Sequence, residues 1–391
     1  MAGLKFMAKT SVKKVTKKVV KKVAQTKIKT RAKKIVRKLI KKTTNKKPVK
    51  KVVKKPSPVK LERAKHNPII KPRMYSWESK ATFNPTAFLD GSDVHIVYRA
   101  IGESDSSVLG YALSHDGYHI LERPTYFIYK RFSDLSPVGE PIDYISGGGW
   151  SGGCEDPRIT RIGDMVYMLY TAFDGWGSVR IAFTSMPLEN FKKKKWHWKK
   201  PVFISPPGKV QKNWVLFPEK INGKYAILHS MSPRVMIAYF DSLDELNGKK
   251  FIESFRKVDP EWQNSWDTWV RGIGPAPIKT KLGWLLLYHA MDKNDPDRYK
   301  LGAIITDIKD PTRILYHSDN PILEPDEHYE NHGHAHGVVY CCGAIVKDKK
   351  LFVYYGGADK YTCVASVSLE ELLEDLQTGK VAKLNKLKKK K

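Results

Sequence analysis

Short apolar strands separated by turn residues recur along the chain from about residue 67 onward. Each copy has an apolar entry strand, a Gly or Asp turn, a second apolar strand, a polar loop and a third strand. The copies begin at residues 84, 156, 217, 274 and 336, so their spacing is 57–72 residues. Units of three to four strands at such a period are typical of propeller blades. The pattern therefore predicts an all-β fold, a five-bladed β-propeller, with a β-sandwich as the alternative.

A polar residue follows the second strand of every copy. These residues are Arg99, Asp174, Ser230, Asp292 and Asp359. In a propeller the strands of all blades converge on a central channel, so side chains at one rim face a common pocket. A sandwich does not explain this recurrence. We therefore expect a polar pocket, assembled from different blades, that suits a sugar.

The first 60 residues follow a different pattern, a Lys-Lys-Val theme with 24 Lys or Arg and no acidic residue. Apolar residues three to five positions apart favour a basic amphipathic helix, whereas repulsion between like charges favours disorder. Prolines 48, 56 and 58 indicate a linker. We expect this tail to contact a polyanion, either nucleic acid or an anionic membrane. The alternative is a solvated tail.

The charge distribution sets the domain boundaries. The formal net charge is +30, and residues 383–391 add six lysines to the basic tail. The residues between the two ends hold 40 basic and 40 acidic side chains, so the body is formally neutral. We therefore divide the chain into a basic tail and linker (1–60), a propeller (61–382) and a basic C-terminal tail (383–391).

Four cysteines in a body of this size do not make a disulfide framework. We expect free thiols in a reducing compartment. The basic N-terminus lacks the apolar core of a secretory signal, and no apolar run approaches the roughly 20 residues that cross a bilayer. Together these features predict a cytoplasmic protein.

The sharpest local motif is GGCEDPR (152–158), where two acids precede a proline and an arginine. A residue before proline is held extended, so Asp156 is expected to be extended and to be presented from a strand end. The glycine-rich run at 147–153 lets the backbone approach a ligand closely. The alternative is that Glu155 and Asp156 are turn acids paired with Arg158.

The EDPR motif stands in the chain with NPTAF (84–88), IGPAP (273–277), GWLLLYH (283–289) and VYYGGADKYTCVA (353–365). In this order the motifs resemble glycoside hydrolase family 130, over roughly residues 66–370. That family consists of β-mannoside phosphorylases and some mannosidases on a five-bladed propeller. The resemblance implies no metal and no cofactor, with inorganic phosphate as the co-substrate of a phosphorylase and an oligosaccharide or disaccharide as substrate.

The resemblance also implies roles for individual residues. Asp156 corresponds to the general acid, which acts through the sugar's 3-hydroxyl. The substrate-binding residues that it implies are Asn84, Asp359, Tyr288, His289 and His336. The residues at or near the phosphate pocket are Arg99, Arg158, Lys212 and Asn213. Tryptophans 214, 266 and 269 are candidates for stacking on sugar faces or for the core.

One departure from the family pattern bears on the reaction. Phosphorylases of the family have His-Arg at the end of the third-blade strand, whereas this chain has His229-Ser230. Phosphate is an anionic nucleophile that cations bind, whereas water needs a carboxylate base. Glu219 or Asp267 is a candidate base for hydrolysis, and Arg234 or Arg271 is a candidate replacement for the phosphate-binding arginine.

The preferred reading is an inverting β-mannoside phosphorylase. The alternatives are a β-mannosidase, a sugar-binding propeller without catalysis, and a structural or nucleic-acid-associated protein whose tail is the functional part. A metal site built on the alternating histidines 332, 334 and 336 is disfavoured against hydrogen bonding or substrate contact.

Overall fold

The computed structural model describes residues 58–130, 152–173, 179–232, 234–254 and 266–378, together with Arg31, Lys33 and Lys34. The chain divides into an N-terminal part, Met1–Ser57, and a body, Pro58–Lys391. In the N-terminal part the three described residues are helical and exposed. The remaining predictions for residues 1–57, the glycine-rich positions 147–151, Asp174 and the C-terminal tail lie outside the described residues.

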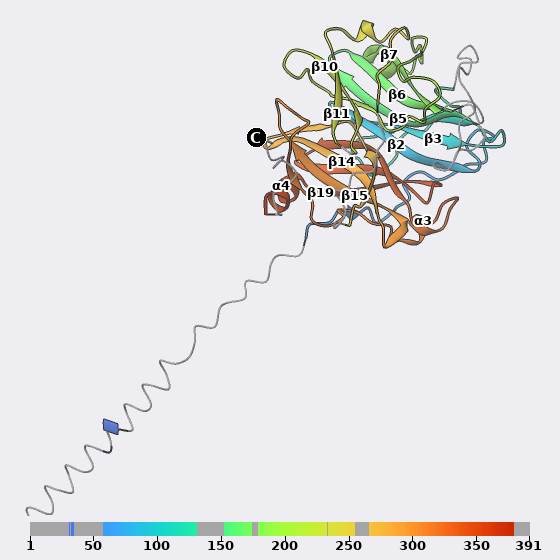
Figure 1. Cartoon of the computed structure of the whole chain (residues 1–391). Helices are drawn as coiled ribbons and strands as arrows, with labels where there is room; N and C mark the ends of the chain where they lie inside the picture. Colours follow the sequence, from blue (N-terminus) through green and yellow to red (C-terminus); the bar gives the residue numbers. More distant parts are fainter. Residues whose placement is uncertain are drawn as a thin grey trace, which may run out of the picture. The chain divides into compact units, whose positions relative to one another are not determined.

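Strands dominate the body, and the helices described there are short. They are α2 (Leu188–Lys192), the 3₁₀ helix η1 (Leu243–Glu245), α3 (His328–Asn331) and α4 (Leu369–Thr378). Within the described ranges, no helix is long and apolar enough to cross a membrane. Figure 1 shows α4 at the edge of the body, near β19 (Tyr361–Ser368). All four cysteines are buried and free of disulfides, as expected.

A seven-stranded sheet contains the first two antiparallel repeats. The first repeat is β2 (Ala81–Asp90), β3 (Asp93–Ile101) and β4 (Ser107–Ser114), and the second is β5 (Gly153–Ile162), β6 (Met165–Phe173), β7 (Val179–Pro187) and β8 (Val202–Phe203). A single parallel pair, Ser107 with Gly153, joins the two repeats. All other pairings in this sheet are antiparallel.

Three further sheets supply the remaining repeats. The third repeat is β9 (Val215–Leu216), β10 (Tyr225–Ser230) and β11 (Met236–Phe240). The fourth is β12 (Trp269–Ile273), β13 (Ile278–Thr280), β14 (Gly283–Asp292), β15 (Asp295–Thr306) and β16 (Ile314–His317). The fifth is β17 (Val339–Lys347), β18 (Lys350–Gly357) and β19, with β1 (Glu62–Arg63) at its edge. The prediction of a β-rich body with five repeating units is confirmed.

The middle strands of the repeats are buried on both faces. In β14, Leu285 and Leu287 pack into one apolar cluster, while Trp284, Leu286 and Tyr288 pack into another. Successive side chains of a strand point to opposite faces, so one strand supplies two different clusters. For this reason the sequence of the second strand in each copy is a continuous apolar run, without alternation of apolar and polar residues.

The five large apolar clusters connect the repeats in sequence order, and the last cluster connects the fifth repeat to the first. Representative members, in that order, are Val97 and Met168, Leu169 and Ile227, Leu228 and Leu286, Leu287 and Val353, and Tyr354 and Ile96. Each repeat therefore packs against two neighbours. A two-sheet sandwich has a single shared core instead, so the sandwich alternative is wrong.

Candidate active site

The entry strands carry local irregularities at the same end of the body. The pairing register shifts between Phe83 and Thr86 in β2, and between Glu155 and Arg158 in β5. Similar shifts occur at Val270/Gly272 in β12 and at Cys341/Gly343 in β17. Such bulges change the direction of a side chain and are frequent beside active sites.

Asn84 and Asp156 occupy the first two bulges, and both have a φ of +48°. This left-handed region is uncommon for residues other than glycine, but Asn and Asp tolerate it best. A proline follows each residue, and since proline has no N–H it leaves no ladder donor unpaired in the bulge. The expectation that Asp156 is extended is therefore wrong, because the bulge outweighs the usual preference before proline.

The bulges bring a cluster of buried polar side chains together. Arg99 donates to Glu155 at 2.8 Å and to Asp156 at 3.3 Å. Asn84 donates to the same Asp156 oxygen at 2.8 Å, and Lys212 donates to the second Glu155 oxygen at 3.1 Å. Four of these five side chains are buried, and Lys212 is nearly so. The cluster joins β2 and β3 of the first repeat, β5 of the second and the segment before β9 of the third.

Arg158 is buried and donates to several protein acceptors. It donates to the Gly274 carbonyl oxygen at 2.9 Å, to the Asp156 carbonyl oxygen at 2.8 Å and to the Asn213 side chain at 2.9 Å. Tyr340 of β17 donates to the same Asn213 oxygen at 2.6 Å. The two acids therefore pair with Arg99 and Lys212, and the alternative that they are turn acids paired with Arg158 is wrong.

Two carboxyl groups of the site, those of Asp156 and Asp359, have pKa values that are shifted in opposite directions. Burial favours a high pKa for Asp156, but the charges of Arg99, Lys212 and Arg158 hold that pKa below its ordinary value. Burial raises the pKa of Asp359 to about 6, with Arg99 opposing the rise and the Asp156 charge adding to it. In the free protein Asp156 is thus ionised at neutral pH, while Asp359 gains a proton near pH 6.

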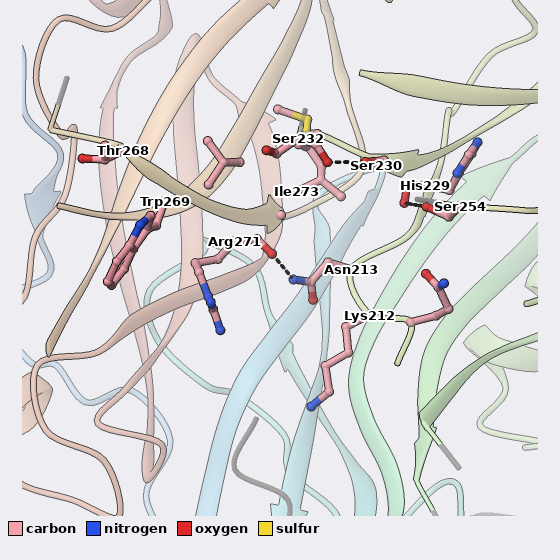
Figure 2. Close-up of a pocket in the computed structure, with 14 residues that line it drawn as sticks. Lys212, Asn213, His229, Ser230, Ser232, Ser254, Thr268, Trp269, Arg271 and Ile273 are labelled. Atoms are coloured by element: carbon pink, nitrogen blue, oxygen red, sulfur yellow. Dashed lines mark hydrogen bonds between the residues drawn. The ribbon is translucent and has the colours of Figure 1, made fainter. Parts of the chain in front are cut away.

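A cavity of about 380 Å³ lies between the third and fourth repeats (Figure 2). Its described lining is Gln211, Lys212, Asn213, His229, Ser230, Met231, Ser232, Ser254, Thr268, Trp269, Val270, Arg271, Gly272 and Ile273. Lys212 and Asn213 thus belong both to this lining and to the polar network around Asp156. The described lining contains two cations and no carboxylate.

Two predicted substrate residues are buried and are not part of the described lining of this cavity. Tyr288 donates to Asp267 at 2.5 Å and lies 2.8 Å from the Nε2 of His317. His289 accepts from the Cys341 amide at 2.8 Å, and its ring stacks on Tyr340. Neither residue lines the cavity, so their role at the acceptor sugar stays a prediction from the resemblance.

The remaining candidates have separate environments. His336 is exposed, and its Nδ1 lies 2.8 Å from the Asn331 carbonyl oxygen. Trp214 belongs to the core and Trp266 stacks on Tyr288, whereas Trp269 is 42% exposed and lines the cavity. In the part of the chain that the structure describes, no three His, Cys, Asp or Glu side chains are grouped to hold a metal ion.

Two residues of the site had no predicted role in it, Glu155 and Tyr340, whereas Arg271 was one of two candidate replacements for the phosphate-binding arginine. Glu155 precedes Asp156, and neighbours on a regular strand point to opposite faces. Only the bulge allows both carboxylates to reach Arg99, and its signal is the Asp-Pro pair. No local pattern distinguishes Tyr340 from other polar strand residues.

Replacing Glu155 by Gln should destabilise the fold by about 3 kcal/mol, because it leaves the buried Arg99 and Lys212 without their shared carboxylate. Urea unfolding at neutral pH measures the loss. The matched control is Glu103→Gln on an exposed loop, which should change stability by less than about 0.5 kcal/mol. Equal stability of Glu155→Gln and wild type would contradict the proposed dependence of the cluster on Glu155.

Asp359 should make stability depend on pH. Its folded-state pKa is raised to about 6, so its contribution is present at low pH and is lost as the pH rises through that value. Relative to Asp359→Asn, the wild type should therefore lose up to about 3 kcal/mol of unfolding free energy between about pH 4 and pH 8. Asp348→Asn, on an exposed turn, gives the baseline for losing a carboxylate. Parallel pH curves for Asp359→Asn and wild type would rule out the raised pKa.

Comparison with known proteins assigns the chain to one family. A family model described as β-1,4-mannooligosaccharide phosphorylase, of glycoside hydrolase family 130, matches residues 43–378. The chain is 36% identical to a 1,2-β-oligomannan phosphorylase and 34% identical to a β-1,2-mannobiose phosphorylase, both of Thermoanaerobacter sp. (strain X514). Each match covers 80% of this chain and 99% of the relative. A solved glycosyl hydrolase from Bacteroides ovatus is 26% identical, with a TM-score of 0.65 over 80% of this chain and 95% of that one. The chain belongs to glycoside hydrolase family 130.

Proposed function

We propose that the five repeats are the blades of a five-bladed β-propeller. The five apolar clusters support this, because each lies between neighbouring repeats and the fifth repeat packs on the first. The pairing of β1 with β19 adds a strand from the N-terminal end of the body to the last blade. The entry strands, with their bulges, are then the inner strands around the channel.

We propose that the protein is a β-mannoside phosphorylase acting on β-1,2-linked mannobiose or longer oligomannosides. The two Thermoanaerobacter relatives support this substrate class by their names. The observation that carries the reaction type is the cavity beside the Asp156 cluster, with Lys212 and Arg271 and no carboxylate in its described lining. Such a lining suits an anionic nucleophile and offers water no base.

In the proposed reaction, an oxygen of inorganic phosphate attacks the anomeric carbon of the terminal mannosyl group. The bond from this carbon to the glycosidic oxygen breaks, and inversion of the β-linkage gives α-mannose 1-phosphate. The leaving oxygen takes the proton of Asp156 through the sugar's 3-hydroxyl. Asn84 and Arg99 hold the carboxyl group, and the half-buried Asp359 hydrogen-bonds a sugar hydroxyl.

The lowered pKa of Asp156 makes its protonation depend on the second substrate. In the free protein Arg99, Lys212 and Arg158 keep this carboxyl group ionised at neutral pH. A phosphate anion beside Lys212 offsets part of that positive field and therefore raises the pKa of Asp156. The proton donor thus forms when phosphate is bound, which disfavours cleavage of the mannoside without it.

The hydrolase alternative needs a carboxylate that activates water. Of the two candidates, Glu219 is exposed and paired with Lys279 at 2.5 Å. Asp267 is buried, where Tyr288 and His317 contact it. Neither residue lines the cavity, which favours phosphorolysis.

We also propose, from their charge, that residues 1–60 contact a polyanion and, from the free cysteines, that the protein works in the cytoplasm. The acid-free, lysine-rich composition of these residues differs from that of the formally neutral body, which supports a tail that plays no part in catalysis. Neutralisation of phosphate groups by its 24 basic side chains would make the contact salt-dependent.

Asp156→Asn should lower the release of mannose 1-phosphate by about 100- to 10,000-fold, because the variant has no proton to donate. Its amide oxygen still accepts from Asn84 and Arg99, so the fold should persist. The assay follows β-1,2-mannobiose with and without inorganic phosphate, with Asp164→Asn on an exposed turn as the active control. If Asp156→Asn were active, the role of Asp156 as the acid would be refuted. If wild type released free mannose at the same rate with and without phosphate, the enzyme would be a hydrolase.

Deletion of residues 1–57 should leave the turnover rate unchanged and abolish salt-sensitive retention on a heparin column. Both proteins are compared at the same salt concentrations, since the expected interaction weakens steeply with salt. Equal retention of the two proteins would contradict the polyanion proposal, and a lower turnover of the truncated protein would contradict a tail without a catalytic part.

A further inference from the structure

A second cavity, of about 340 Å³, lies between the second and third repeats. Its described lining comes from β6, β7 and β8 of the second repeat and from β10 and η1 of the third. It shares no described residue with the active-site cavity. A volume of this size lies within the range of ligand cavities, roughly 300–1,000 Å³.

Strand β10 connects the two cavities. Its first residue, Tyr225, lines the second cavity, and its last residue, Ser230, lines the active-site cavity. Five residues of extended strand span about 17 Å. The second cavity therefore lies at the other end of the third repeat, and a ligand in it is separate from the one that reacts at Asp156.

The walls of the second cavity are largely aromatic and aliphatic. The rings of Tyr167 and Phe183 stack, with their centres 5.9 Å apart and their planes 11° apart. Tyr225 and Leu243 belong to the same apolar cluster between the two repeats. Tyr167 and Tyr225 are only half-buried, so part of each side chain is left to the cavity. Ring surface of this kind covers the apolar C–H groups of a sugar.

The same lining carries polar groups without protein partners. Ser185 is 4% exposed, and its hydroxyl has no hydrogen-bond partner among the described residues. Lys199 is exposed and forms no ion pair with a described residue. Asp244 is the one carboxylate of the described lining. Burial raises the pKa of Tyr167, and the nearby Tyr225 and Asp244 add to the rise, so its hydroxyl stays a neutral donor.

This combination of groups matches a neutral saccharide. A sugar hydroxyl both donates and accepts, so it needs donors such as Lys199 and an acceptor such as Asp244. Burying the Ser185 hydroxyl without a partner is unfavourable, and a sugar hydroxyl would satisfy it. The Asp244 carboxylate disfavours an anion, in contrast to the active-site cavity, whose described lining has no carboxylate.

We propose that this cavity is a second, non-catalytic binding site for oligomannosides, with Tyr167 and Tyr225 as its ring walls and Ser185, Lys199 and Asp244 as its polar contacts. The proposal rests on the proposed function, because its ligand belongs to the proposed substrate class. A site of this kind keeps a long oligomannoside on the protein and raises the local concentration of chain ends at the active site.

Calorimetric titration with β-1,2-mannotetraose in the absence of phosphate, so that no turnover occurs, tests the proposal. Wild type should bind two molecules per chain. Tyr225→Leu, which keeps apolar volume in the cluster, and Asp244→Ala should each weaken the second event by about 10- to 100-fold. Tyr239→Leu is the matched control, because Tyr239 is an exposed tyrosine of the same repeat and lines neither cavity.

Urea unfolding establishes that each variant is folded, and the rate of mannobiose phosphorolysis should stay within about twofold of wild type. One binding event in wild type, or an unchanged second event in both variants, would overturn the second site while leaving phosphorolysis intact. Tighter binding of mannose 1-phosphate than of mannotetraose at this site would overturn its neutral ligand. If wild type released no mannose 1-phosphate from mannosides, the proposed function would fail, and the titrations of wild type and Tyr225→Leu would still decide the second site.

Discussion

The guanidinium of Arg99 lies between Glu155 and Asp156, and the rest of the site depends on this contact. Burying three charges is costly, so such a cluster is not retained for stability alone. Here it connects the first two repeats and fixes the direction of one carboxylate. It also holds the pKa of that carboxylate below its ordinary value. Position and protonation of Asp156 thus have a common cause.

Backbone strain is part of the same arrangement. Asn84 and Asp156 both have left-handed φ angles in bulges of their entry strands. Conformations of this kind persist where surrounding contacts over-determine them. Three contacts hold Asp156 in this conformation: the hydrogen bond from Asn84, the ion pair with Arg99, and the hydrogen bond that Arg158 donates to the Asp156 carbonyl oxygen. Two repeats are therefore needed to place one carboxylate.

The sequence was informative where one pattern recurs. The apolar second strands predicted five repeats, and EDPR with four other motifs identified the family. It failed where the outcome depends on tertiary contacts. Asp156 is left-handed because of a bulge, and Arg99 and Arg158 are satisfied by partners from other repeats. The burial of Tyr288 with Asp267 and His317 was not foreseen either, and its place beside a sugar stays a prediction. Arg271 was a candidate from the sequence, and it lies in the cavity lining at the register shift before Gly272.

The central claim is that Asp156 is ionised in the free protein and becomes protonated when phosphate binds. Infrared difference spectroscopy of the phosphate-bound minus the free protein at neutral pH tests it directly. We predict a C=O stretching band of a protonated carboxyl group that grows with phosphate occupancy and is missing in Asp156→Asn. A spectrum without this band, or the same band in wild type and Asp156→Asn, would contradict the account.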